Sequence, residues 1–522
     1  MKIGIVTLGC DKNTVDAEYI AGHLAAQGAQ VLRAEPYLPE ETQEEGDEGR
    51  GETRGGETRG GETRRGGCGF DAVVILTCGF IDAAQEESSA AIEYWLERKR
   101  RSGGALIVAI AGCLSQLWSD DLRAQYPGID LIAGVGEFAA LAEAIAKQAS
   151  RSGKGLAPAQ TLCASDSSDR SDASDQSDKP STAILKSGAP DAHLAQAAPR
   201  LPLDQCATAY LKISDGCDYA CAFCSIPLMK GRYRSVAPGI LIEEARGLIA
   251  RGAREIILVA QDVSAYGTDF ASEGGTSPGA RYRLPNLLRD LAALPGDFWL
   301  RIMYFYPGGF SDEMIEVMAA EPKICPYLDI PLQHLDSGII KAMRRPYSEV
   351  KVFDWIKRLR ARLPDVSLRT TFVVGFPGEA DKEFRRLLKG LGDIRFDNVG
   401  FFPFSPQEGT PAAKMKGQVP EKVKMQRCER LARRQRQVAE ESLSRFIGHK
   451  IEVLVDGRFP ETDLYIGHAR YQAPEVDGMT RFISTAPLEN GSVARVRITA
   501  VEGFDLIGEA VSEQRSQRRT AP

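Results

Sequence analysis

Three cysteines on one short loop, Cys217, Cys221 and Cys224, have the spacing of an iron–sulfur site with an open iron. The apolar run Ala209–Ile213 before them predicts a strand that leads into this loop. A loop with C-x3-C-x2-C spacing can bind three irons of a 4Fe–4S cube and leave the fourth iron without a protein ligand. An open iron can take part in chemistry. Structural zinc is the alternative, but zinc favours four protein ligands, and no second C-x-x-C pair lies nearby.

A second set of cysteines, Cys10, Cys78 and Cys113, is far more widely spaced, yet each cysteine follows a predicted strand and precedes a predicted helix. The three strands are Ile3–Leu8, Val73–Thr77 and Ile107–Ala111. Because the carboxyl ends of parallel strands share one edge of a sheet, where ligands bind, we expect these cysteines to converge on one metal site. The alternative is that each is simply a small buried residue. The other cysteines lack a pattern and are interpreted as ordinary thiols: Cys68, Cys163, Cys206, Cys325 and Cys428.

Strands and helices alternate in residues 1–148, which predicts an α/β domain with a doubly wound parallel sheet. Its expected strands are Ile3–Val6, Ala72–Leu76, Ala105–Ile110 and Asp130–Ala133. Residues 39–67 contain Gly-Glu-Thr-Arg repeats and are predicted to be a disordered low-complexity insertion. Residues 149–204 are rich in Ser, Asp, Ala and Pro and are predicted to be a disordered linker.

The alternation resumes in residues 205–443, where six strand–helix units suit an open, partial TIM-like (β/α) barrel. The expected strands are Tyr210–Ser214, Glu255–Ala260, Trp299–Tyr304, Tyr327–Ile330, Leu368–Val374 and Asn398–Phe404. Residues 444–511 have short apolar runs between Gly, Asp and Pro, which predicts a small antiparallel β-barrel. Residues 512–522 form a polar tail.

The composition narrows the class of protein. Hydrophobic residues make up 43% of the chain, and no apolar run reaches the length of about 20 residues that a membrane span needs. We find no signal peptide at the start, so the 11 cysteines favour a reducing cytoplasm and metal binding over disulfides. The net charge of −6 argues against a nucleic-acid binder.

Together these residues resemble the methylthiotransferases of the radical S-adenosylmethionine (SAM) superfamily. The resemblance covers nearly all of the chain outside the two predicted disordered segments, and no cluster ligand departs from the family pattern. The matching segments are Thr7–Asn13, Thr77–Ile81 and Gly112–Gln116, and Ala473–Gly478 resembles a TRAM domain. The resemblance implies a SAM-binding 4Fe–4S cluster on Cys217, Cys221 and Cys224, and an auxiliary 4Fe–4S cluster on Cys10, Cys78 and Cys113.

The resemblance also implies which residues contact SAM. Phe223 matches the family's aromatic residue before the last cysteine, and the run that contains Gly375 and Glu379 resembles a SAM-contacting strand. Four more side chains are expected at the carboxyl ends of barrel strands, where they would line the site. These are Gln261, Asp262, Gln333 and His334. A histidine at a strand end often has a structural role, so we assign no proton transfer to His334.

Two branches of the family differ in substrate. One modifies an adenosine of transfer RNA, and the other modifies the β-carbon of an aspartate of small-subunit ribosomal protein S twelve. Gln261–Asp269 matches the Gln-Asp-x-x-x-Tyr-Gly-x-Asp signature of the protein branch, and Cys78–Ile81 is also closer to that branch. Residues 447–511 contain ten acidic and six basic side chains, a net charge of −4, which would repel RNA and suit a basic ribosomal protein.

The expected reaction follows from the resemblance. Reductive cleavage of SAM would give a 5′-deoxyadenosyl radical that removes hydrogen from the β-carbon, while the auxiliary cluster would hold an added sulfide that a second SAM methylates. The expected partners are therefore the ribosomal protein, a reducing electron donor and a sulfide source, with no membrane and no specific tRNA binding. The alternatives are a tRNA adenosine methylthiotransferase and, from another class, a non-catalytic iron–sulfur redox protein, which would have no use for two open sites.

Overall fold

The computed structural model describes residues 1–37, 69–151, 182–185, 200–204, 207–270, 282–345, 347 and 349–511. The predicted insertion at 39–67 and the tail at 512–522 lie outside these residues. The chain forms two compact units, one of Met1–Pro190 with Ala198–Asp204 and one of Asp191–Ala197 with Gln205–Pro522. No helix in the described part is long and apolar enough to cross a membrane.

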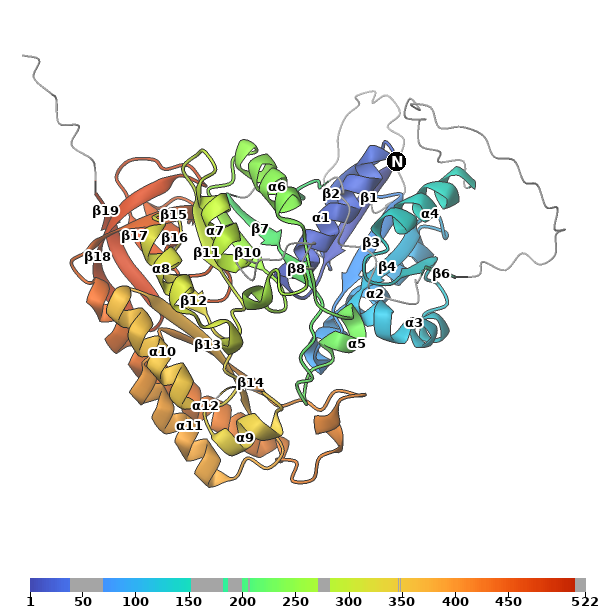
Figure 1. Ribbon diagram of the computed structural model, residues 1–522. Helices are drawn as coiled ribbons and strands as arrows, with labels where there is room; N and C mark the ends of the chain where they lie inside the picture. The colour runs from blue at the N-terminus through green and yellow to red at the C-terminus, as the bar shows by residue number, and fades with distance from the viewer. Residues whose placement is uncertain are drawn as a thin grey trace, which may run out of the picture. The chain divides into compact units, whose positions relative to one another are not determined.

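The first unit is built on one sheet of six parallel strands in the order β2-β1-β3-β4-β5-β6 (Figure 1). The strands are β1 (Lys2–Thr7), β2 (Gln30–Arg33), β3 (Ala72–Thr77), β4 (Ile107–Gly112), β5 (Leu131–Ala133) and β6 (Ala183–Leu185). The helices are α1 (Asp11–Ala26), α2 (Asp82–Arg101), α3 (Cys113–Gln125) and α4 (Phe138–Arg151). Apolar side chains of α1 and α4 pack on one face, and those of α2 and α3 pack on the other. The predicted doubly wound parallel sheet is confirmed.

The two edge strands are absent from the sequence prediction. Residues of β2 are mostly exposed, and β6 lies inside the segment 149–204 that the sequence predicts to be a linker. β2 is a mostly exposed edge strand with polar residues at both ends, and β6 is an apolar run of only three residues, Ala-Ile-Leu, so neither gives a clear hydrophobic pattern.

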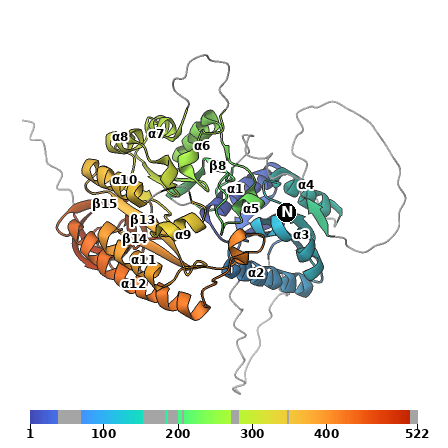
Figure 2. The same ribbon diagram turned by 60° about the horizontal axis from the view of Figure 1, so that its bottom comes forward.

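The second unit begins with a partial barrel of six parallel strands in two sheets, β11-β10-β7 and β12-β13-β14. An isolated parallel bridge pairs Leu300 of the first sheet with Ile324, which comes just before the first strand of the second sheet. The strands are β7 (Thr208–Lys212), β10 (Glu255–Val259), β11 (Trp299–Ile302), β12 (Tyr327–Asp329), β13 (Ser367–Val374) and β14 (Asn398–Pro403). The helices between them are α6 (Pro238–Ala250), α7 (Leu284–Ala292), α8 (Asp312–Ala320), α10 (Glu349–Arg362), α11 (Asp381–Ile394) and α12 (Glu421–Leu443). All six predicted strands are present, and α11 and α12 lie side by side outside the sheet (Figure 2).

Short elements lie in the connections of this unit. They are β8 (Ser214–Asp215), β9 (Arg234–Ser235), α5 (Ile226–Lys230), α9 (Ser337–Ala342), and the 3-10 turns η2 (Val263–Ala265), η3 (Pro307–Gly309), η4 (Pro411–Lys414) and η5 (Ser444–Phe446).

The unit ends in a closed barrel of five strands in the order β15-β16-β17-β19-β18. These strands are β15 (Lys450–Arg458), β16 (Leu464–Ala469), β17 (Thr480–Ile483), β18 (Val493–Glu502) and β19 (Asp505–Ala510). The sequence predicts an antiparallel barrel, but β17 and β19 pair in parallel. The prediction is wrong for this pair because an apolar run shows where a strand lies and not the direction of its partner.

The five-stranded barrel packs against the partial barrel at the end where β10 begins. Leu454 and Ala473 join an apolar cluster with Ile257, Trp299 and Tyr327. A network of buried charged groups accompanies this cluster. The Glu255 carboxylate accepts hydrogen bonds from Arg301 Nε at 2.8 Å and lies 2.8 Å from His468 Nε2. Paired charges of this kind fix the geometry of an interface, because each charge is costly to bury without its partner.

Candidate functional site

The three widely spaced cysteines of the first unit lie at the carboxyl edge of its sheet. Cys10 follows β1 and precedes α1, Cys78 follows β3, and Cys113 follows β4 as the first residue of α3. In the sheet order, β1 lies between β2 and β3, so the chain passes from β1 to β2 on one side and then crosses back to β3 on the other side. Ligands of open α/β sheets bind at such a switch point, beyond the carboxyl ends of the strands.

Three glycines show how closely the loops approach one another. A Cβ atom on Gly9 would lie 2.6 Å from the Cβ and 3.0 Å from the Sγ of Cys78. A Cβ on Gly79 would lie 3.4 Å from the carbonyl carbon of Cys113, and one on Gly112 would lie 2.7 Å from the Thr77 oxygen. The chain therefore brings the loops of Cys10, Cys78 and Cys113 into direct contact, and glycine is the residue that permits it.

Side chains around these loops hold their backbones in place. Asn13 donates from Nδ2 to the carbonyl oxygens of Leu8 at 2.8 Å and Thr77 at 3.3 Å, which ties the first loop to the end of β3. The Cys78 N–H donates to Ser88 Oγ at 3.0 Å. Among the described residues, no group of three ligating side chains is already arranged to hold a single metal ion. A cube imposes no such requirement, because each thiolate would bind a different iron.

The loop of Cys217, Cys221 and Cys224 is fixed at both ends. Cys217 N–H donates to the Gly231 oxygen at 3.1 Å, and a Cβ on Gly216 (φ 76°) would lie 2.1 Å from the Arg232 oxygen. On the other side, the Ala222 N–H donates to the Met343 oxygen at 3.0 Å, and the Ala222 oxygen accepts from Ala412 N–H at 2.8 Å. The loop conformation is therefore set by the surrounding barrel.

The thiols of this loop lie close enough to influence one another. Burial raises the pKa of Cys224 to about 12, and the nearby Cys221 and Cys217 contribute to the increase. Burial likewise raises the pKa of Cys217 to about 11. Without a metal both thiols are therefore neutral at pH 7. Binding of iron as thiolates would release protons.

A buried ion network lies directly before this loop. The Asp215 carboxylate lies 3.2 Å from Lys212 Nζ and 3.6 Å from Lys230 Nζ. Burial alone would raise the pKa of Asp215, but the two ammonium groups lower it to about 2. The network keeps the ammonium groups of Lys212 and Lys230 close to the cysteine loop, where they would stabilise a negatively charged group.

Glu379, a predicted SAM contact, has its carboxylate engaged within the protein. Its side chain is buried, and it accepts from the Gly375 N–H at 2.8 Å and from Arg427 Nη1 at 2.7 Å. The Asp336 N–H donates a hydrogen bond to His334 Nδ1, which places the ring hydrogen on Nε2. The Nε2 atom lies 3.3 Å from Glu379 Oε2. The geometry gives Glu379 and His334 the role of shaping the turn that begins at Gly375.

Gly375 and Phe223 lie where the turn meets the cysteine loop. Gly375 has φ of 76°, and a Cβ on it would lie 2.4 Å from Lys424 Cγ. The Phe223 ring packs edge-to-face on Phe376, with 6.5 Å between ring centroids. Gln333, also expected at this end of the barrel, has a φ of 68°. Its backbone oxygen accepts a hydrogen bond from the Val373 N–H.

Several buried polar atoms near the cysteine loop lack partners among the described residues. They are Gln261 Oε1, Asp262 Oδ2, Tyr306 Oη and Arg345 Nε. The charge of Asp262 acts on Cys217, and Tyr306 interacts with Cys221. A buried polar group without a partner costs about 1–3 kcal/mol, so these atoms suit a polar ligand with amine, carboxylate and hydroxyl groups. The site thus fits both an iron cluster and SAM.

Sequence reasoning missed three of the aromatic and basic residues here. Tyr219 lies within the cysteine loop and stacks on Tyr306 with 4.2 Å between centroids, and Arg345 lies over the Tyr306 ring. The position of Tyr219 between two ligands was a usable signal, and so was that of Tyr306 just after β11. Arg345 gives no such signal, because its position depends on the turn at the end of α9.

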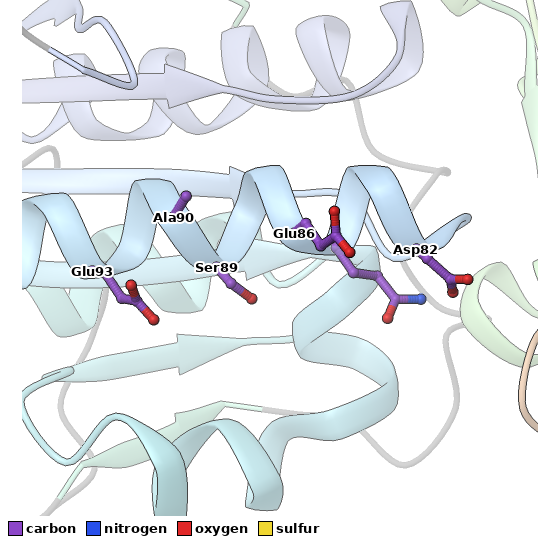
Figure 3. Close-up of a pocket in the computed structure, with 6 residues that line it drawn as sticks. Asp82, Glu86, Ser89, Ala90 and Glu93 are labelled. Carbon is purple, nitrogen blue, oxygen red and sulfur yellow. The ribbon is translucent and has the colours of Figure 1, made fainter.

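A separate open pocket lies along α2 and contains none of the six cysteines (Figure 3). It is lined by Asp82, Gln85, Glu86, Ser89, Ala90 and Glu93, which all come from that one helix. An acidic helix face of this kind is ordinary solvated surface, and we assign no ligand to it.

Family models match three parts of the chain. Residues 59–134 match "Uncharacterized protein family UPF0004", residues 211–391 match "Radical SAM superfamily", and residues 447–511 match "TRAM domain". The two cysteine sets fall in the first two of these matches, apart from Cys10.

Similar proteins align over almost the whole chain. The "Ribosomal protein uS12 methylthiotransferase RimO" of Geobacter sulfurreducens is 35% identical over 98% of this chain and 99% of its own length. The protein of the same name from Desulforudis audaxviator is 36% identical over 98% of this chain and 97% of its own. Among solved structures, the radical S-adenosylmethionine methyltransferase TsrM of Kitasatospora setae has a TM-score of 0.52 at 15% identity, covering 79% of this chain and 73% of that one. That likeness concerns the fold.

Proposed function

Since this chain belongs to the RimO family of ribosomal protein uS12 methylthiotransferases, we propose that it transfers a methylthio group to the β-carbon of one aspartate of uS12. The observation that carries this proposal is the match to relatives of that name over 98% of the chain. The relatives favour the protein substrate over the tRNA alternative.

We assign the SAM cluster to Cys217, Cys221 and Cys224, and the auxiliary cluster to Cys10, Cys78 and Cys113. When bound, the first would supply the electron that cleaves SAM, and the second would carry the sulfur to be transferred. The barrel's own residues do the positioning. Buried Asp262 and Tyr306 offer polar atoms to SAM beside Cys217 and Cys221.

The substrate-binding surface that we propose is acidic. On the carboxyl-terminal barrel, Glu452, Glu461, Asp463, Glu489 and Glu502 are exposed. Asp477 is different, because its side chain is buried beside Arg369 and adds nothing to the outer surface. An acidic surface favours a basic protein over RNA. The reaction also needs a reducing electron donor and a sulfide source, and we place it in the cytoplasm, where the ribosomal substrate is made.

The substrate is tested by offering both candidates to the loaded enzyme. Reconstituted protein is incubated without oxygen with SAM, reductant and sulfide, and given either uS12 or undermodified tRNA. Mass spectrometry should find a gain of ~46 Da, as expected for replacement of hydrogen by a methylthio group, on one aspartate of uS12. The control omits SAM. A gain on adenosine instead would move the chain to the tRNA branch and refute the argument from the acidic surface.

A further inference from the structure

Arg345 is a buried cation in direct contact with one of the cysteines assigned to the SAM cluster. It follows α9, and it is one of the few buried basic side chains of the described chain. Its Nη1 donates to Cys221 Sγ at 3.8 Å, and its Nη2 donates to the Pro331 oxygen at 2.7 Å. Its guanidinium lies over the ring of Tyr306, with 4.5 Å to the ring centroid.

A strained turn holds Arg345 in this position. The Arg344 N–H donates to the Lys341 oxygen at 3.0 Å, and the Arg345 N–H donates to the Ile340 oxygen at 3.1 Å, which is the Schellman arrangement at a helix end. That arrangement places Arg344 in the left-handed region, with φ of 57°. Glycine usually fills this position, and a larger residue costs about 1–2 kcal/mol. Such strain is retained where the surrounding structure needs the geometry.

The same turn is bonded to the cysteine loop. The oxygen of Met343, two residues before Arg345, accepts the Ala222 N–H at 3.0 Å, and Ala222 is the neighbour of Cys221. The guanidinium and the Cys221 sulfur are therefore held together by the backbone as well as by their own contact. A movement of one loop would have to carry the other.

Within the part of the chain that the structure describes, no acidic side chain forms an ion pair with Arg345. Its largest charge interactions are with Tyr347, Cys221 and Tyr306, and none of these is a carboxylate. Its Nε has no hydrogen-bond partner among the described residues. A buried cation without a counterion is strongly unfavourable, so the geometry calls for an anionic group beside Cys221. A cube held by three thiolates is such a group, because its net charge is negative and becomes more negative on reduction.

We propose that Arg345 is a positioning residue whose guanidinium, fixed against Cys221, raises the reduction potential of the cluster on that loop. The inference rests on the proposed function, since it needs that cluster. Hydrogen bonds to cluster sulfurs and nearby charge are the means by which proteins adjust such potentials. A cation stabilises the reduced, more negative state more than the oxidised state. An electron from a physiological donor would then be easier to accept before SAM is cleaved.

The test is a redox titration of the full chain with Cys10, Cys78 and Cys113 replaced by alanine, so that one cluster gives the signal. In this background Arg345→Met should shift the midpoint potential to more negative values, with at least a tenfold lower ratio of reduced to oxidised cluster at a fixed donor potential. For one electron that is 59 mV. The matched control is Arg344→Met, which removes the same charge from the neighbouring exposed position and should leave the potential unchanged.

Arg345→Lys serves as the conservative variant. It keeps the charge without the planar fork, and it should restore part of the potential. If Arg345→Met binds no cluster, the midpoint potential of Arg345→Lys is compared with that of the parent instead, and this comparison tests the role of Arg345. Equal potentials in all these proteins would overturn the role of Arg345 while leaving the proposed function intact. Absence of a cluster from the parent itself would instead refute the assignment of Cys217, Cys221 and Cys224.

Discussion

Replacement of Cys10 by alanine should abolish methylthio transfer while SAM cleavage stays within about twofold of the parent. Cys10 would bind one iron of the auxiliary cluster, and loss of one of three thiolates would release that cluster with the sulfur it carries. The SAM site is built from Cys217, Cys221 and Cys224 on another unit of the chain, so its ligands are unchanged. The measurement is the yield of 5′-deoxyadenosine and of methylthiolated uS12 in the same reaction.

Two further variants sharpen this result. Cys217→Ala should lose both products, because methylthio transfer needs the radical that SAM cleavage supplies. Cys428→Ala is the matched control, since Cys428 is a partly buried cysteine of α12 that belongs to neither set, and it should retain both products. Methylthiolated uS12 from the Cys10→Ala protein would show that the two cysteine sets do not divide the reaction as proposed.

Replacement of Glu255 by alanine should lower the free energy of unfolding of the second unit by about 3–5 kcal/mol, the usual loss when one partner of a buried ion pair is removed. The side chains of Glu255 and Arg301 are both fully buried, and the carboxylate also contacts His468 of the five-stranded barrel. The variant leaves the buried Arg301 without its counterion, and His468 keeps only Asp456. Urea denaturation followed by circular dichroism measures the loss.

The matched control is an acid–base pair of the same type at the surface. Asp297, with an 85% exposed side chain, lies 3.1 Å from Arg254. Asp297→Ala should change the free energy of unfolding by no more than about 1 kcal/mol, because solvent screens an exposed pair. An equal loss in both variants would mean that the barrel interface does not depend on its buried network.

The pH dependence of stability gives a second measure of the Glu255 network. Burial alone would lower the pKa of His468, but Glu255 and Asp456 raise it from 6.5 to about 9. Because the folded pKa is raised, the stabilisation is complete below pH 6.5 and is lost as the pH rises through about 9. The parent should therefore lose stability between these values, and Glu255→Ala should show a flatter profile over the same range.

The sequence predicts the inner strands and the cysteine sets because both leave local signals. Buried strands such as β3 are continuous apolar runs, and a cysteine at the end of each run marks the shared edge. The edge strands leave weaker signals, since β2 is mostly exposed and the apolar run of β6 is only three residues long. The parallel pairing of β17 with β19 is also invisible, because it depends on contacts far apart in the chain.

The polar contacts of the site are also hard to predict from the sequence, because they join residues far apart in the chain. The SAM contact of Glu379 stays a prediction. Its carboxylate accepts hydrogen bonds from Gly375 and Arg427. Arg427 lies on α12, far along the chain, and nothing in the local pattern connects it to the turn. Arg345 reaches Cys221 only because Arg344 adopts a left-handed conformation that is unusual for its residue type. Partners of this kind are decided by tertiary structure.

In the proposed function, this chain removes a hydrogen atom from the β-carbon of one aspartate and puts a methylthio group in its place. The most direct measurement follows that hydrogen. The loaded enzyme is given uS12 in which aspartate is deuterated at the β-carbon, and the 5′-deoxyadenosine is analysed by mass spectrometry. We predict deuterium in the 5′-deoxyadenosine and its loss from the methylthiolated aspartate. Methylthiolated product formed with no deuterium in the 5′-deoxyadenosine would contradict the account.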